Sequence, residues 1–351
     1  MTTLIVDGSR GEGGGQILRT SLSLATLTGR PVQLTHIRAG RSRPGLRPQH
    51  LTAVRALAQI CNATLSGDEI DSQALTFRPG SPPQGGPYTF DVETVALHGS
   101  AGAASLVALA VLWPLLFAEE PSRVVIRGGT HVPFSPPFHY LAHVARPAFA
   151  RLGASFEIEL DAWGWMPQGK GALSLEIRPV RSLQAGAFVP EAREPVQGVA
   201  AVTNLPSHIP QRMARRASNL LDAAGLENRI EPRRERGVAP GAGLFLWVAQ
   251  AGASMLGRQG LPAEEVAEAA VAELLAFADN ETAAVDAHLA DQLLLPMVLA
   301  HGHSTFTTNQ ITQHTITHAA LLRRWFGTAI AVEGREGQPG RVSVEGAGWS
   351  R

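Results

Sequence analysis

The sequence predicts a mixed α/β fold (α+β in the strict sense), with three repeated units in one large domain and a small α/β domain inserted into the third unit. Three observations lead to this prediction. Apolar residues follow helix and strand periods in turn along the chain. The order helix, strand, helix, strand, strand recurs three times. The length, 351 residues, allows two or three domains of roughly 150 residues each.

The first two copies of the unit follow one another without interruption, and each begins with an extra strand. The first is predicted to contain strand 4–7, helix 16–27, strand 31–37, helix 50–60 and strands 63–66 and 75–78. The second is predicted to contain strand 88–92, helix 101–117, strand 123–126, helix 137–152 and strands 155–160 and 173–177. In each copy, tight turns rich in glycine and proline separate the elements.

The third copy is interrupted just after Pro179. Its own elements are predicted as helix 285–300, strand 304–307, helix 315–326 and strands 329–332 and 341–344. The interrupting segment carries strand 198–203, helix 210–224, strand 243–249 and helix 263–277. We therefore expect a large domain of residues 1–180 and 281–351, and an inserted small α/β domain of residues 181–280.

The composition excludes several classes of protein. Thirty basic and thirty acidic residues give a formal net charge of +0, so any polyanion must be recognised by a local group of arginines. The single cysteine, Cys61, excludes a disulfide framework and a cysteine-based zinc site. The single lysine, Lys170, does not stand in a P-loop motif. The longest apolar run, residues 106–118, is shorter than a membrane span. Together with the lack of a signal peptide, this predicts a soluble cytoplasmic protein.

A glycine-rich turn at residues 11–16 links the first strand to the first helix. Such a turn directs backbone N–H groups at an anion beside the positive end of the helix. Glu12 would repel that anion, unless a divalent cation lies between the carboxylate and phosphate oxygens. Arg19, one turn into the helix, is able to reach back towards the same place. The alternative is a flexible turn with a solvated glutamate.

An arginine-rich loop follows the second strand. Its arginines are Arg38, Arg41, Arg43 and Arg47, and Gln49 and His50 begin the next helix. Guanidinium groups match phosphate oxygens two at a time, so this loop is a candidate phosphate site. The alternative is a solvated charged loop.

The C-terminal part contains two further candidates. His301, His303, His314 and His318 suggest zinc, but their spacing offers no third ligand, and HExxH is absent. His314 lies between a strand and a helix N-terminus, where a neutral imidazole can attack phosphorus. Asp291 and Gln292 precede a buried apolar run, either as an ordinary helix-terminal carboxylate and amide or as nucleotide or metal contacts.

These blocks resemble the RNA 3'-terminal phosphate cyclase family. DGSRGEGGGQILR, RAGRSRPGLRPQHL, FRPG, GSAG, RGGT, LADQLLLPM and QHT occur in the family's order over nearly the whole chain. The resemblance implies ATP-dependent conversion of an RNA 3'-terminal phosphate to a 2',3'-cyclic phosphate, through a histidine–AMP intermediate and an RNA adenylate. It implies that the protein binds ATP, an RNA with a 3'-terminal phosphate, and magnesium or manganese. It implies no membrane association. The oligomeric state stays open, with a homodimer as one possibility.

The resemblance also assigns roles to residues of this chain. The nucleophile falls on His314, and the metal-binding carboxylate falls on Glu12. The nucleotide and phosphate contacts fall on Arg19, Arg38, Arg41, Gln49, His288, Leu289, Ala290, Asp291 and Gln292. The chain departs from the family pattern at Leu109, His139, Lys170 and His318. By ungapped counting from GSAG, Leu109 stands where the family usually has a glutamine that contacts ATP, and this departure argues against normal ATP affinity or base choice.

Two alternatives to an active cyclase remain. One is a non-catalytic relative that acts in RNA binding or ribosome assembly; that branch of the family lacks the histidine that His314 provides here. The other is a transferase of similar repeated fold that acts on a small phosphorylated metabolite. The arginine loop fits this transferase, whereas the QHT and LADQ blocks do not.

Overall fold

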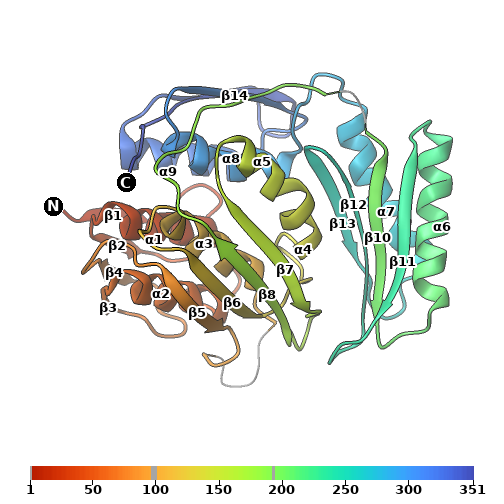
Figure 1. Ribbon diagram of the computed structural model, residues 1–351, viewed down its shortest axis with the longest axis horizontal. Helices are drawn as coiled ribbons and strands as arrows, with labels where there is room; N and C mark the ends of the chain where they lie inside the picture. The colour runs from red at the N-terminus through yellow and green to blue at the C-terminus, as the bar shows by residue number, and fades with distance from the viewer. Residues whose placement is uncertain (1, 96–100, 192–193) are drawn as a thin grey trace.

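The computed structural model describes residues 2–95, 101–191 and 194–351 (Figure 1). Within these residues the chain forms helices and four mixed four-stranded sheets. The predicted mixed α/β fold is therefore confirmed. No helix in the described ranges is long and apolar enough to cross a membrane.

The first sheet has the order β1-β2-β4-β3. Its strands are β1 (Leu4–Asp7), β2 (Val32–Thr35), β3 (Thr64–Ser66) and β4 (Leu75–Arg78). Two helices cover it, α1 (Gly15–Thr28) and α2 (Pro48–Cys61). The parallel pair β1–β2 is connected through α1, and the other pairs are antiparallel. Since residues 8–14 connect the end of β1 to the start of α1, the glycine-rich turn lies at the carboxyl edge of this pair.

The second sheet has the order β5-β6-β8-β7. Its strands are β5 (Gly86–Asp91), β6 (Ser122–Gly128), β7 (Phe156–Ala162) and β8 (Gly171–Ile177). Its helices are α3 (Ala104–Leu116) and the consecutive segments α4 (Phe138–Tyr140), η1 (Leu141–Ala145) and α5 (Arg146–Arg151). The last three form one helical stretch with a wider turn at η1, over the residues for which the sequence predicts one helix.

The third sheet has the order β15-β16-β14-β9. Its strands are β9 (Ala187–Phe188), β14 (His303–Thr308), β15 (Ile330–Glu333) and β16 (Gly340–Glu345), with helices α8 (Ala287–Leu299) and α9 (Gln313–Phe326). In all three sheets the first two strands in chain order are parallel, and the fourth strand lies between the second and the third.

A fourth sheet, β11-β10-β12-β13, lies between β9 and α8 in the sequence and at the right of Figure 1. Its elements are β10 (Val196–Thr203), α6 (His208–Ala223), β11 (Asn228–Glu235), β12 (Gly241–Val248), β13 (Ala251–Leu256) and α7 (Ala263–Ala278). The sheet and its two helices enclose their own apolar core. β9 pairs with β14 before this segment begins, and the domain limits drawn from the sequence stay a prediction.

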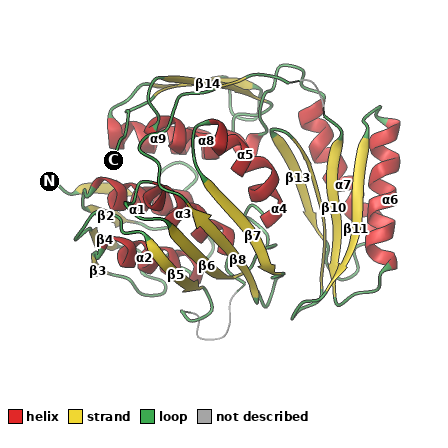
Figure 2. Ribbon diagram, in the orientation of Figure 1, coloured by secondary structure: helices red, strands yellow, loops and turns green. Residues whose placement is uncertain are grey.

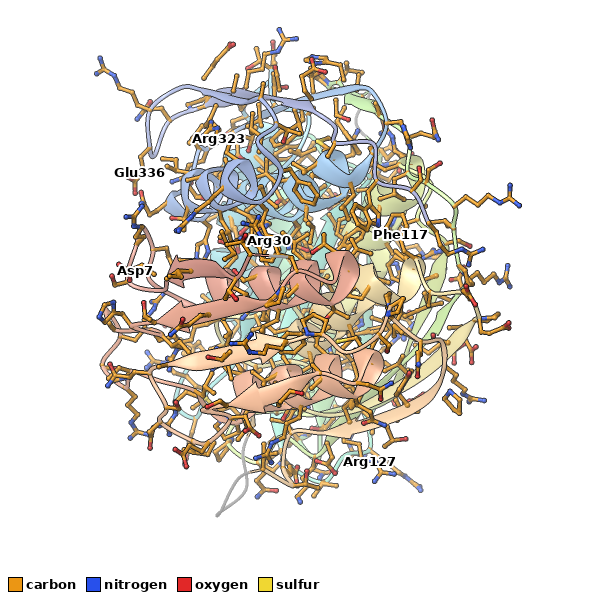
Figure 3. The ribbon with its side chains drawn as sticks, turned by 90° about the vertical axis from the view of Figure 1, so that its left-hand side faces the viewer. Asp7, Arg30, Phe117, Arg127, Arg323 and Glu336 are labelled. Carbon is orange, nitrogen blue, oxygen red and sulfur yellow. The ribbon has the colours of Figure 1, made fainter. Side chains whose placement is uncertain are left out.

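The helices of the first three sheets pack together in the middle, and the sheets lie outside them (Figure 2). One large apolar cluster fills this interior. α1 contacts α9, and α8 contacts α9. In Figure 3 the labelled Arg30, just after α1, lies where the N-terminal segment meets the C-terminal helices. Its guanidinium carbon is 5.8 Å from the ring centre of Trp325 in α9. This packing brings residues from opposite ends of the chain together.

The start of α8 is held by the buried carboxylate of Asp286. It accepts hydrogen bonds from the amides of His288 and Leu289 at 2.8 and 2.7 Å, which caps the helix. It also accepts from the Tyr140 hydroxyl at 2.8 Å and from the amide of Gly252 in β13 at 2.8 Å. A single side chain thus connects α8, α4 and the fourth sheet.

We expect Asp286→Ala to lower the free energy of unfolding by about 3–5 kcal/mol, because four donors lose a buried acceptor at once. Asp286→Asn keeps one carbonyl oxygen and is expected to cost less. Urea denaturation of the three proteins measures both values. Equal losses below about 1 kcal/mol in both variants would show that the carboxylate does not hold these elements together.

Candidate active site

The glycine-rich turn is docked directly on α9. Gly11 has a φ of +59°, and a Cβ added there would lie 2.2 Å from the Thr317 hydroxyl oxygen. The amide of Glu12 donates to the same hydroxyl at 3.0 Å. A residue larger than glycine would therefore push the turn away from α9. The amides that begin α1 have no side-chain cap, so they are available to an anion.

Glu12 lies next to His314, as the sequence reasoning requires. Its side chain is only 10% exposed and forms an ion pair with Arg41 of the arginine-rich loop. Glu12 Oε1 is 3.7 Å from His314 Nε2. The first sequence block, the arginine loop and the QHT segment therefore meet at one point.

His314 is the second residue of α9 and stands two residues after the capping residue Thr312, whose hydroxyl accepts from the Thr315 amide. The sequence places it before the helix, because the apolar period begins only at Thr315. The side chain is 48% exposed, which leaves it open to a ligand. Burial lowers the pKa of His314 below its ordinary value of 6.5, and the charges of Arg19, Arg41 and His288 lower it further. The imidazole is therefore neutral at neutral pH.

Asp291 of α8 lies on the other side of the His314 ring. His314 Nδ1 is 3.8 Å from Asp291 Oδ2 and 3.4 Å from Gln16 Oε1. The Gln16 amide nitrogen donates to Asp291 Oδ2 at 3.0 Å. Burial raises the pKa of Asp291 to about 7, against the opposing charges of His288 and Arg19. α1, α8 and α9 thus each contribute one side chain to this contact.

Arg19 supplies a positive charge beneath these groups. Burial lowers its pKa to about 10, and the charge of Asp291 opposes that shift. The guanidinium therefore stays charged at neutral pH. A Cβ on Gly15 would lie 2.7 Å from Arg19 Nη1 and 2.5 Å from His50 Nε2. Only glycine allows the first turn of α1 to approach these two side chains.

The arginines of the loop have different partners. Arg41 reaches Glu12, while Arg47 forms an ion pair with Asp71. Arg38 donates from Nη1 to the carbonyls of Arg43 and Gly45 at 2.7 and 3.0 Å. Arg38 therefore organises the loop, and burial, followed by the charge of Arg47, lowers its pKa. Arg41 is the loop arginine that touches the cluster around His314.

Gln49 and His50 connect α2 to its surroundings. Gln49 Oε1 accepts from the amide of Ala103 at 2.7 Å, which ties α2 to the start of α3. Burial lowers the pKa of His50 well below 6.5, and Arg19 and Arg38 lower it further. The GSAG block that precedes Ala103 begins outside the described residues.

The segment from His288 to Gln292 forms the first turns of α8. His288 Nε2 lies 3.2 Å from Glu273 Oε1, and this hydrogen bond raises the pKa of His288 to about 9. Leu289 and Ala290 are buried in the main core. The Gln292 amide nitrogen donates to the His288 carbonyl at 3.2 Å. Of this segment, the side chain of Asp291 is the one that contacts Gln16 and approaches His314.

The positions where the sequence departs from the family pattern lie in varied surroundings. Leu109 is partly buried and packs against the main core. His139 is buried, stacks on Phe245 with ring centres 4.6 Å apart, and bonds His131 at 3.1 Å. Lys170 pairs with Glu93.

In the structure, two of the four C-terminal histidines considered for zinc have other side-chain partners. His301 bonds Ser350 at 2.8 Å, and His303 bonds Glu345 at 2.6 Å. Over the described ranges, no group of three or more histidine, cysteine, aspartate or glutamate side chains is arranged to hold a metal ion.

Gln16 is a residue of the site to which the sequence alone assigns no role. It contacts both His314 and Asp291, which lie 298 and 275 residues away in the sequence. Gln16 ends the glycine-rich turn and lies in the first turn of α1. This position is the signal in the sequence that could have indicated a role for it. Periodicity alone does not reveal which helices meet.

The protein thus has an α/β fold with one cluster of polar side chains near the N-terminal ends of its helices. The cluster consists of one histidine, two arginines and two carboxylates, namely His314, Arg19, Arg41, Glu12 and Asp291. This class of site suits phosphate chemistry. The family model for RNA 3'-terminal phosphate cyclase matches residues 10–332. The chain belongs to the RNA 3'-terminal phosphate cyclase family.

Relatives from distant organisms match nearly end to end, and each is named RNA 3'-terminal phosphate cyclase. The protein from Nostoc punctiforme is 50% identical over 331 residues, 92% of this chain and 94% of that protein. The Methylococcus capsulatus protein is 47% identical and covers 99% and 97%. The Pyrococcus furiosus protein is 37% identical and covers 99% and 100%.

Proposed function

We propose that this protein uses ATP to convert the 3'-terminal phosphate of an RNA into a 2',3'-cyclic phosphate, through an adenylate on His314. Family membership supports the overall reaction. The observation that carries the assignment to His314 is the contact of its half-exposed ring with Glu12, Gln16 and Asp291. These four residues come from three of the family's sequence blocks.

Hydrogen bonding indicates which ring nitrogen attacks. Nδ1 lies within hydrogen-bond distance of Gln16 Oε1, at 3.4 Å, whereas the Glu12 oxygen beside Nε2 is farther away, at 3.7 Å. A proton on Nδ1 is favoured there, which leaves the lone pair on Nε2. In the proposed first step, Nε2 bonds to the α-phosphorus of ATP while the bond to the bridging oxygen breaks and pyrophosphate leaves.

Arg19, Arg41 and the N-terminus of α1 are the positive groups around this step. Arg19 is charged and largely buried, and the first amides of α1 carry no side-chain cap. Charges held in place before the reaction stabilise the phosphates without reorganisation. Arg38 shapes the loop that carries Arg41.

Glu12 is the residue that would hold a divalent metal. Glu12 Oε1 is buried and accepts no hydrogen bond of good geometry, although Arg41 neutralises its charge. Magnesium is usually held by one or two carboxylates together with phosphate oxygens, so a single carboxylate beside an ATP site fits it. The metal would neutralise charge on the phosphates. The backbone amide of Glu12 donates to the Thr317 hydroxyl, and this hydrogen bond holds Glu12 in place for the metal contact.

The remaining two steps use the RNA as reactant. An oxygen of the RNA 3'-phosphate attacks the phosphorus of the adenylate, and the bond to His314 Nε2 breaks. The neighbouring 2'-hydroxyl then attacks the 3'-phosphorus and loses its proton, and AMP leaves. Adenylylation supplies the leaving group that a phosphate monoester lacks. Ring closure is fast because the hydroxyl is already attached next to its target.

The overall reaction is tested with an RNA that carries a radiolabelled 3'-terminal phosphate. In the presence of ATP and magnesium, we expect the label to become resistant to phosphatase and AMP to form in equal amount. The same RNA with a 3'-hydroxyl is the control and should yield no AMP. RNA binding without ATP consumption would favour a non-catalytic relative, and turnover of a small phosphorylated metabolite would favour the transferase.

The rate of adenylylation should depend on pH through His314. Because its pKa is lowered, we expect the rate to fall on acidification with a midpoint below 6.5, as the protonated ring has no lone pair to donate. Arg41→Gln removes a charge that lowers this pKa, so the midpoint should move upwards. Arg43→Gln, a neighbouring exposed arginine, should leave it in place. Single-turnover rates between about pH 5 and pH 8 measure the midpoints. A midpoint that moves downwards in Arg41→Gln would contradict this arrangement.

A further inference from the structure

His318 has no part in the three steps above, yet it lies directly beneath the proposed nucleophile. It stands four residues after His314 in α9, so the two side chains share one face of the helix. It is buried, at 5% exposure. A buried histidine needs partners for both ring nitrogens. The partners of the two nitrogens show whether His318 only fills space in the core or also connects neighbouring helices.

Both nitrogens of His318 have partners, on two other helices. Nδ1 lies 2.8 Å from the backbone carbonyl oxygen of Asp291 in α8. A carbonyl only accepts, so the proton is on Nδ1. Nε2 is then an acceptor and takes the hydroxyl proton of Thr20 in α1, at 3.1 Å. Burial lowers the pKa of His318 to about 4, and the charge of Arg19 contributes in the same direction. The neutral ring that makes both bonds therefore persists at neutral pH.

The two histidines form parallel contacts between the same three helices. In the outer contact, His314 meets Gln16 of α1 and the carboxylate of Asp291 of α8. In the inner contact, His318 meets Thr20 of α1 and the carbonyl of Asp291. Gln16 and Thr20 are also four residues apart, one turn of α1. The outer contact is open to ligands, whereas the inner one is closed.

We propose that His318 is a positioning residue for adenylylation: it fixes α9 against α1 and α8, so that the His314 ring stays at the distance where Nε2 reaches the α-phosphorus. This proposal rests on the proposed function. The inner contact is buried and closed to ligands. It acts on the angle and reach of a nucleophile, and a displacement of about 1 Å at such a place costs up to about 100-fold in rate.

The test compares variants that remove one or both inner bonds. His318→Leu removes both, and we expect it to lower the single-turnover rate of His314 adenylylation by about 10- to 100-fold. The ATP concentration at half-saturation should change by less than about threefold. His318→Asn places an amide nitrogen near Nδ1, keeps the bond to Asp291, and should recover part of the rate. Unchanged rates in His318→Leu would overturn the proposal.

Thr20→Val tests the bond to α1 from the other side. It should slow adenylylation in the wild-type background and have no further effect in His318→Asn, because the same bond is already lost. Thr26→Val is the matched control, since Thr26 is a buried threonine of the same helix whose hydroxyl bonds Cys61 instead. If Thr20→Val and Thr26→Val slow the reaction equally, His318 acts through stability alone and the proposal is wrong.

A crystal structure of His318→Leu separates this proposal from the proposed function, because it needs no ATP. If the inner contact positions the His314 ring, the substitution will move Nε2 from its place 3.7 Å from Glu12 Oε1. An unmoved ring would contradict positioning. A wild-type protein whose His314 never carries an adenylate would contradict the proposed function instead.

Discussion

Replacement of His314 by alanine is expected to abolish covalent labelling of the protein by ATP radiolabelled at the α-phosphate, with a loss of at least about 10³-fold. The ring supplies the only bond to the adenylyl group in the proposed mechanism. The measurement is label retained after denaturing electrophoresis. His303→Ala is the matched control, because His303 is a half-exposed histidine of β14 that bonds Glu345 at 2.6 Å, and it should label normally.

The loss of label in His314→Ala must not arise from unfolding. The His314 side chain is 48% exposed, and its contact with Gln16 is long, at 3.4 Å. The free energy of unfolding should therefore change by less than about 1 kcal/mol. Persistence of label on folded His314→Ala would mean that another side chain takes the adenylate, and the assignment to His314 would fail.

The second large effect is expected for Glu12→Gln, which keeps the size of the side chain and removes its charge. We expect adenylylation to slow by about 10²–10³-fold. The dependence on magnesium concentration should move to higher concentrations, because the carboxylate that would hold the cation is gone. Rates measured over a magnesium titration separate a weaker metal contact from a disturbed fold.

Glu93→Gln is the control for this experiment. Glu93 is also a largely buried glutamate, 18% exposed, paired with Lys170, and its substitution should leave the magnesium dependence unchanged. If Glu12→Gln adenylylates His314 at the wild-type rate and with the wild-type magnesium dependence, the carboxylate has no role in the step. The ion pair with Arg41 would then be purely structural.

The sequence predicts most of the fold because the segments that form the first three sheets have regular apolar patterns. β1 and β4 begin and end where the alternation predicts. β11 (Asn228–Glu235) was missed, since its sequence NRIEPRRE contains a proline and many charges. β11 lies at the edge of its sheet, and one side of it forms no hydrogen bonds with another strand. Proline and charged residues are tolerated at such an edge. β13 was missed because AGASML is mostly small residues with weak alternation.

The candidate site could be predicted as a set of residues but not as an arrangement. The glycine turn, the arginine loop and His314 stand out because their composition has a chemical meaning. Nothing in the sequence states that Arg41 pairs with Glu12 while Arg38 bonds the loop's own carbonyls. Nor does it show that Gln16 connects His314 to Asp291, because three helices far apart in the chain must first pack.

The inner contact of His318 was likewise invisible, and the residue counted as one more histidine of a histidine-rich tail. Only the packing of α9 against α1 and α8 shows that both its nitrogens have partners on other helices. Tertiary contacts of this kind depend on helix crossing and cannot be read from a local pattern.

Mass spectrometry of the intact protein, followed by peptide mapping, after incubation with ATP and magnesium tests the central claim most directly. We predict a mass increase of one adenylate, located on the peptide that carries His314 and lost when RNA with a 3'-terminal phosphate is added. An unmodified protein, or an adenylate on any other residue, would contradict the claim.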